Sequence, residues 1–144
     1  MIDVKLLVAA VVLAGLAGVA ACGSTPPGDE EESGGDAILA AAFRDRAGDL
    51  EVQGRGTVAR LLADDDEGSR HQRFILRLRS GQTLLVAHNI DAAPRVEGLA
   101  VGHEVAFKGV YEWSEQGGTI HWTHHDPDGE HAAGWLRHGA KTYE

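Results

Sequence analysis

Strict alternation of side chains between residues 72 and 79 constrains the fold of this chain more than any other feature. A period of two is typical of a β-strand that buries one face and exposes the other. The face expected in the core consists of Gln72, Phe74, Leu76 and Leu78, and the opposite face consists of Arg73, Ile75, Arg77 and Arg79. The alternation therefore predicts a sheet protein and indicates which side of this strand faces the core.

A hairpin is expected to return the chain directly after this strand. Residues 80–81, Ser-Gly, are a typical two-residue turn, and residues 82–90 form the predicted returning strand. With this turn, Arg73 lies opposite His88. Both side chains would then share the outer face of the sheet.

A second hairpin is predicted from residues 104–113 and 119–124. With residues 115–118 as its loop, Glu112 pairs with His121, and the aromatic side chains of the two strands collect on the opposite face. A slip of one residue would mix aromatic and charged side chains on both faces, so burial favours this register.

The order of these strands predicts the architecture. A first strand over residues 52–62, a hairpin, a connection and a second hairpin resemble an oligonucleotide/oligosaccharide-binding (OB) barrel. Asp36 is a suitable N-cap for a preceding helix that ends near Gly48. We therefore expect a mainly β fold, a small five-stranded antiparallel OB-like barrel with an N-terminal helix.

The N-terminal residues 1–21 have the pattern of a lipoprotein signal peptide. An apolar run from Leu6 to Ala20 follows Lys5, and small residues directly precede Cys22, the only cysteine of the chain. The run is short for a membrane span. We expect Cys22 to be lipidated and to attach the protein to a membrane; a plain signal peptide and an anchor helix are the alternatives.

The rest of the chain divides into a tether and one domain. Residues 22–35 are rich in Gly, Pro and acidic side chains and predict a flexible linker with a reach of roughly 20 Å. Residues 36–144 have the length of a single OB-like domain. By resemblance to lipoprotein sorting rules, Gly23 after the cysteine favours a location in the cell envelope, on the periplasmic face of the outer membrane.

The charge of the chain bears on its partners. It has 13 Lys and Arg against 22 Asp and Glu, a formal net charge of −9. Nucleic-acid binding requires clustered positive charge to neutralise phosphates, so this balance argues against a nucleic-acid partner.

Residues 121–131 hold four of the eight histidines and suggest a metal site. Neutral imidazoles and carboxylates are the ligands that zinc and similar divalent ions take when no thiolate is free. The candidate ligands are His121, His124, His125 and Glu112. In the alternative interpretation, these histidines hydrogen-bond a tight turn and cover a wet surface.

Arginines on the first hairpin suggest a second kind of site. Guanidinium groups on one sheet face bind phosphate or carboxylate well. The candidate ligand-binding residues for a small anion are Arg73, Arg77, His88 and Arg95. The alternative is that this face packs under the helix while the arginines extend outward to water.

Two further functions remain open. A metal-bound water beside the arginines could hydrolyse a phosphodiester, although the sequence contains no phosphate-binding loop, nucleophile elbow or His-Glu-x-x-His helix. Alternatively, the protein is a structural or protein-interaction lipoprotein. Whether it is an enzyme is left undecided by the sequence.

Several uncommon motifs occur together in a fixed order. The chain carries His71-Gln72-Arg73-Phe74-Ile75, Ala87-His88-Asn89-Ile90-Asp91, Pro94-Arg95 and His121-Trp122-Thr123-His124-His125-Asp126-Pro127. In these motifs it resembles a bacterial envelope family, domain of unknown function 3465. The resemblance implies a small secreted or lipid-anchored domain, and it implies no reaction and no catalytic residues.

Overall fold

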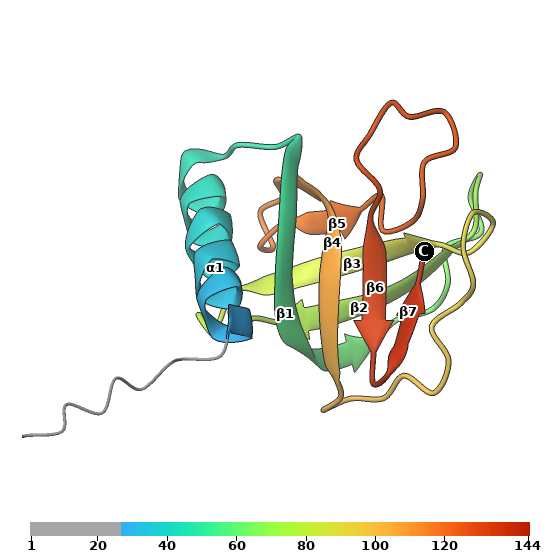
Figure 1. Cartoon of the computed structure of the whole chain (residues 1–144), viewed down its shortest axis with the longest axis horizontal. Helices are drawn as coiled ribbons and strands as arrows, with labels where there is room; N and C mark the ends of the chain where they lie inside the picture. The colour runs from blue at the N-terminus through green and yellow to red at the C-terminus, as the bar shows by residue number, and fades with distance from the viewer. Residues whose placement is uncertain (1–26) are drawn as a thin grey trace, which may run out of the picture.

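The computed structural model describes residues 27–144 (Figure 1). The predicted signal peptide and lipidation site at Cys22 lie outside these residues. The described elements are α1 (Pro27–Asp45), β1 (Leu50–Leu61), β2 (His71–Arg77), β3 (Thr83–Asn89), β4 (Glu104–Glu112), β5 (Thr119–His121), β6 (Trp135–His138) and β7 (Lys141–Tyr143). Within this part of the chain, no helix is long and apolar enough to cross a membrane.

Five strands close into a barrel in the order β1-β2-β3-β5-β4, and β4 pairs back onto β1. This confirms the mainly β, OB-like fold with one N-terminal helix. The expectation of a purely antiparallel barrel is wrong, because β3 and β5 are parallel. In a closed ring of five strands the directions cannot alternate at every step, so one neighbouring pair must run the same way.

The β6–β7 hairpin extends the sheet beyond the barrel. β6 pairs with the first half of β4, from Val105 to Lys108, and β5 pairs with its last residues, from Val110 to Glu112. Both strands therefore share one edge of β4. The segment between them, residues 122–134, projects from the barrel as a long loop (Figure 1).

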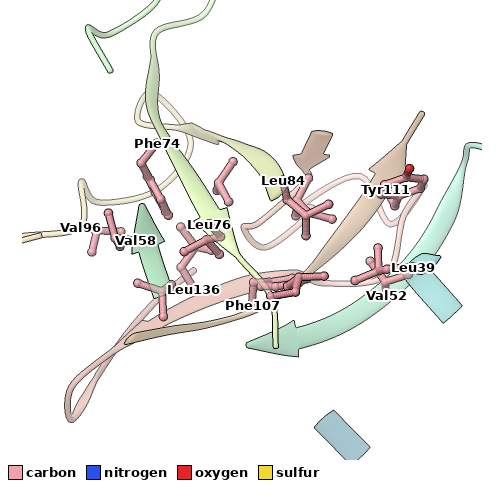
Figure 2. Packing of buried hydrophobic residues seen from close by; sticks show 14 of the residues in the cluster. Leu39, Val52, Val58, Phe74, Leu76, Leu84, Val96, Phe107, Tyr111 and Leu136 are labelled. Carbon is pink, nitrogen blue, oxygen red and sulfur yellow. The ribbon is translucent and has the colours of Figure 1, made fainter. Parts of the chain in front are cut away.

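The core fills the barrel and extends to the helix. Figure 2 shows Leu39 of α1 beside Val52 of β1 and near Tyr111 of β4. The helix thus covers an open end of the barrel. The largest fully buried side chains of the core are Tyr111, Phe74, Phe107, Leu39, Leu76, Leu84, Ile120 and Leu136.

The β2–β3 hairpin has a different register from the predicted one. Arg73 pairs with Ala87, and Gln72 pairs with His88. The turn is one residue longer than expected, since Leu78 N–H donates to Gln82 O at 2.9 Å and Gly81 adopts a left-handed φ of 89°. A shift of one residue reverses the faces of the returning strand, so His88 lies inside the barrel and not beside Arg73.

The β4–β5 hairpin is shifted by two residues from the predicted register, which preserves the faces. His121 pairs with Val110, and Glu112 pairs with Thr119, so the predicted pairing of Glu112 with His121 is wrong. Trp122 has a left-handed φ of 54°, which is rare for a bulky residue, and the strand ends just before it.

The helix begins earlier than predicted. Residues 27–35, predicted as part of the flexible linker, belong to α1, and Asp36 lies within the helix rather than at its N-cap. Proline at the first helical position and acidic residues soon after it are both favourable at a helix N-terminus. The sequence prediction interpreted the same residues only as linker composition.

Candidate functional site

The histidine-rich loop, defined here as residues 121–134, folds back on itself. The Trp122 ring lies 4.2 Å from the His131 ring and 5.3 Å from the His124 ring, between centroids. Gly134 N–H donates to His124 O at 3.0 Å, and a side chain at Gly134 would collide with the Trp122 carbonyl oxygen. The left-handed backbone at Trp122 thus places its indole among histidines of the loop.

His88 of β3 lies inside the barrel and contacts Thr123 of this loop. Its side chain is 0% exposed, its Nε2 lies 3.0 Å from Pro94 O, and its Nδ1 lies 2.8 Å from Thr123 Oγ1. A carbonyl only accepts, so Nε2 carries the proton, and Nδ1 accepts from the Thr123 hydroxyl. Burial lowers the pKa of His88, which favours this neutral ring. Both of its nitrogens are therefore already bonded.

Two other side chains hold the loop by bonding its backbone. His124 Nδ1 donates to His125 O at 2.8 Å. The Asp126 carboxylate accepts the N–H groups of His131 at 2.8 Å and Asp128 at 3.0 Å, and these bonds lower its pKa. These contacts agree with the interpretation in which polar side chains of this segment fix a tight turn.

The predicted metal ligands are brought together only as a pair. His121 Nε2 lies 3.8 Å from Glu112 Oε1, too far for a hydrogen bond. Burial lowers the pKa of His121, and the Glu112 charge opposes this, so the pair carries little ionic character near neutral pH. Among residues 27–144, no group of three or more His, Cys, Asp or Glu side chains is arranged to hold a metal ion. Metal binding therefore stays a prediction.

The predicted anion-binding residues are divided among separate places. His88 is inside the barrel, and Arg73 and Arg95 line a pocket shared with Asp64 and Glu97. In that pocket Arg95 forms an ion pair with Asp64, and Arg73 Nε donates to Ala63 O at 3.0 Å. The carboxylates offset the positive charge there.

Arg77 belongs to a different and more basic pocket. This pocket, of about 590 Å³, is also lined by Arg55 and Arg79, with Asp36 and Glu104 as its acids. Arg77 and Arg79 are exposed at the end of β2 and in the turn that follows. The side chains of Arg77 and Arg79 are therefore open to solvent.

A neighbouring pocket continues the same surface. It shares Arg55 and Glu104 with the first and adds Arg137, His103 and His138. Cross-strand pairing explains the continuity, because Arg55 of β1 and Arg137 of β6 are both partners of Ala106 on β4. We name the whole surface the arginine groove: Arg55, Arg77, Arg79, Arg137, His103 and His138, with Asp36 and Glu104.

The charges of the arginine groove are only partly neutralised. Arg55 pairs with Glu104 at 2.6 Å. Asp36 accepts the Ser80 N–H at 3.1 Å. Within residues 27–144, no carboxylate forms an ion pair with the remaining arginines of the groove, which are Arg77, Arg79 and Arg137.

Two histidines form one wall of the groove. His103 Nδ1 and His138 Nε2 lie 2.9 Å apart in a stacked pair, and His138 Nδ1 lies 3.2 Å from Glu97 O. Because the Glu97 carbonyl only accepts, His138 Nδ1–H donates to it, and His138 Nε2 accepts from His103. The pair is thus held in place by the segment before β4.

Sequence reasoning missed most of the arginine groove. Only Arg77 was among the predicted anion-binding residues. Arg55 and Arg137 are far apart in sequence and meet only because β6 pairs with β4, and β6 has four residues, too few for a clear period. The available signal was the pair of neighbouring arginines Arg77 and Arg79, which the alternation placed on one face.

A comparison with protein families gives one match. The family model described as "Protein of unknown function (DUF3465)" matches residues 27–144, most of the chain. The match confirms the resemblance drawn from the sequence motifs. A search of curated proteins finds no match.

Proposed function

The chain belongs to the DUF3465 family, and we propose, from its N-terminal sequence pattern and the charge of the groove, that it is an envelope lipoprotein that binds a small anionic ligand in the arginine groove. The proposal is one of binding without turnover. The observation that carries it is the convergence of four arginines on two connected pockets that have two carboxylates between them.

The chemistry of the groove suits phosphate or carboxylate. A guanidinium offers a planar fork of donors that can bind two oxygens of an anion at once. Arg77, Arg79 and Arg137 are exposed, so their donors can reach a ligand without first leaving a buried ion pair. The net charge of the chain is −9, so the excess of arginines over carboxylates in the groove is local.

The size of the surface favours a compact ligand. The pocket around Arg77 is about 590 Å³, within the usual range for small-molecule sites. A long polyanion would extend past the groove onto a protein that is strongly acidic overall, where like charges repel it. We therefore propose a ligand with one or two phosphate or carboxylate groups.

Calorimetric titration with pyrophosphate and inorganic phosphate tests the proposal. We expect the double variant Arg77→Gln/Arg79→Gln to bind pyrophosphate at least tenfold more weakly than the wild type, a loss of about 1.4 kcal/mol. The matched control is Arg44→Gln/Arg60→Gln, which removes two exposed arginines outside the groove. Equal affinities in both double variants, or no binding by the wild type at millimolar concentrations, would overturn the proposal.

A further inference from the structure

The two histidines of the arginine groove are brought together by strand pairing. His103 directly precedes β4, and its carbonyl accepts the Val58 N–H of β1 at 2.8 Å. His138 is the last residue of β6, which pairs with β4. Both histidines therefore lie on the pocket that Arg55 and Arg137 also line.

The hydrogen bonds of this pair determine which ring nitrogen can take a further proton. The Glu97 carbonyl only accepts, so His138 Nδ1 carries a proton, and His138 Nε2 accepts from His103 Nδ1 at 2.9 Å. A neutral imidazole has one N–H, so His103 Nε2 has no proton in the neutral pair. In the part of the chain that the structure describes, no group hydrogen-bonds this nitrogen, and the His103 side chain is exposed. A proton added to His103 Nε2 thus leaves both existing hydrogen bonds intact.

This one proton changes how His103 interacts with an anion. Without it, His103 Nε2 presents a lone pair, which repels the oxygens of an anion. With it, the charged ring presents an N–H donor of the kind that binds phosphate or carboxylate oxygens most strongly. A second proton on the pair would break the bond between the rings and place two positive charges in contact. The pair therefore takes up one proton at most while it stays intact.

Charged groups on the neighbouring strands make this protonation depend on the ligand. Arg55 of β1 and Arg137 of β6 oppose a positive charge on His103. Glu104 of β4 favours it, but this carboxylate is already paired with Arg55 at 2.6 Å. A bound dianion offsets the arginine charges and so makes the protonation of His103 favourable. By thermodynamic linkage, the proton strengthens anion binding by the same factor.

Other charged groups at this end of the barrel do not supply the missing positive charge. Lys141 of β7 and Glu97 of the segment before β4 pair with each other at 2.9 Å. The first turns of α1 contain Asp29, Glu30, Glu31 and Glu32, so this end of the barrel is not basic overall. An anion is therefore held by direct contacts in the groove, and one further charged donor should change its affinity measurably.

We propose that the arginine groove binds a small dianion together with one proton from solvent, and that His103 takes up this proton at Nε2 and donates it to the ligand in a hydrogen bond. His138 is then a positioning residue, because it fixes the His103 ring. This inference rests on the proposed function and adds to it the charge of the ligand and a further binding residue. Since histidines ordinarily titrate between about pH 5 and 8, affinity should increase as pH falls through this range.

Calorimetric titration with sulfate tests the inference. Sulfate remains a dianion throughout this pH range, so a pH dependence of its binding arises in the protein. We expect the wild type to bind sulfate about tenfold more tightly at pH 5.5 than at pH 8.5, because a charge-assisted hydrogen bond is gained. Titration at pH 7 in two buffers of different ionisation enthalpy should show uptake of a fraction of a proton, and not more than one, per sulfate bound.

The variant His103→Gln removes the titrating ring from the groove. Its affinity for sulfate should change less than about threefold between pH 5.5 and pH 8.5, and its proton uptake should decrease with it. The matched control is His71→Gln, which removes a histidine outside the groove and should keep the pH dependence of the wild type. A pH dependence that persists in full in His103→Gln would overturn the role of His103.

Two variants of His138 test the positioning role. The amide oxygen of His138→Gln can accept the His103 N–H, so this variant should keep most of the pH dependence. In His138→Ala this acceptor is lost, so the pH dependence should decrease while sulfate binding at pH 8.5 stays the same. Circular dichroism of both variants shows whether they fold. Equal pH profiles of sulfate binding in folded His138→Gln and His138→Ala would overturn the positioning role.

The two anions distinguish this inference from the proposed function. Sulfate binding of equal affinity at pH 5.5 and pH 8.5 would overturn the coupled proton and leave anion binding by the arginines standing. Pyrophosphate binding without sulfate binding at pH 5.5 would also overturn this inference alone. Failure of both anions to bind at millimolar concentrations would overturn both proposals.

Discussion

The histidine-rich loop and the arginine groove lie toward opposite ends of β4 (Figure 1), and they differ in where their polar atoms find partners. In the loop, His124 and Asp126 bond the backbone of their own segment, and Thr123 bonds the buried His88. In the groove, Arg77 and Arg79 extend into an open pocket. A side chain can bind a ligand only with donors or acceptors that the fold has not already used.

The two regions also differ in what they contribute to stability. The ring of His88 exchanges water for two hydrogen bonds inside the barrel, and removing it leaves both partners without theirs. The exposed arginines of the groove lose little hydration on folding. We therefore expect substitutions in the first region to change unfolding free energy and substitutions in the second to change binding.

The largest effect should come from His88→Ala. The change opens a cavity in the core and leaves the Pro94 carbonyl and the Thr123 hydroxyl without their partner, so we expect a loss of about 3–4 kcal/mol in unfolding free energy, measured by urea denaturation. Such a loss is a large part of the stability of a small domain.

A neighbouring histidine provides the control. His125→Ala removes an exposed ring from the same loop and should cost less than about 0.5 kcal/mol. If His88→Ala lost no more unfolding free energy than this control, His88 and the loop it contacts would not stabilise the fold, and the proposed difference between a structural loop and a binding groove would be wrong.

Local patterns predicted the buried face of β2 correctly and that of the neighbouring strand β3 incorrectly. The alternation of β2 correctly buried Phe74 and Leu76 and exposed Arg77. The face of β3 depended on the turn, and Ser-Gly suits both a two-residue turn and the longer one observed. Because one extra turn residue reverses a strand, His88 was placed outside, although its neighbours Leu84 and Val86 are as buried as it is.

The arginine groove could not be predicted from local patterns, because it depends on contacts between distant segments. Arg55 and Arg137 become neighbours only through Ala106 of β4. By contrast, the histidine run was obvious in the sequence because its members are consecutive. Composition reveals residues that are clustered along the chain, whereas a ligand site requires side chains that meet in space. In this protein the histidines are clustered in the sequence, and the arginines of the groove are clustered in space.

The pH dependence of stability should be smaller than the effect of His88→Ala. The pKa of His88 is lowered by burial, so below about pH 6.5 the unfolded chain binds a proton that the folded chain does not, and stability decreases as pH falls. We expect the unfolding free energy of the wild type to decrease between pH 7 and pH 5, measured by urea denaturation at each pH.

The variant His88→Gln isolates this contribution. A glutamine does not titrate, so the decrease between pH 7 and pH 5 should be smaller than in the wild type. The lowered pKa of His121 has the same sign and remains in the variant, so the decrease should not vanish. Identical pH profiles would show that His88 is not the buried neutral group that the hydrogen bonds require.

The smallest effect should follow from adding zinc. Of the predicted ligands, only Glu112 and His121 lie near one another, and within residues 27–144 no three potential ligands converge, although zinc requires three or four. Zinc at 100 µM should therefore raise the melting temperature, measured by circular dichroism, by less than about 3 °C relative to a sample in chelator. A larger rise that disappears in His121→Ala would mean that the loop rearranges to supply further ligands. The hydrogen bonds that the loop side chains make to the loop backbone would then be replaced by bonds to zinc. The loop, like the arginine groove, would be a binding region.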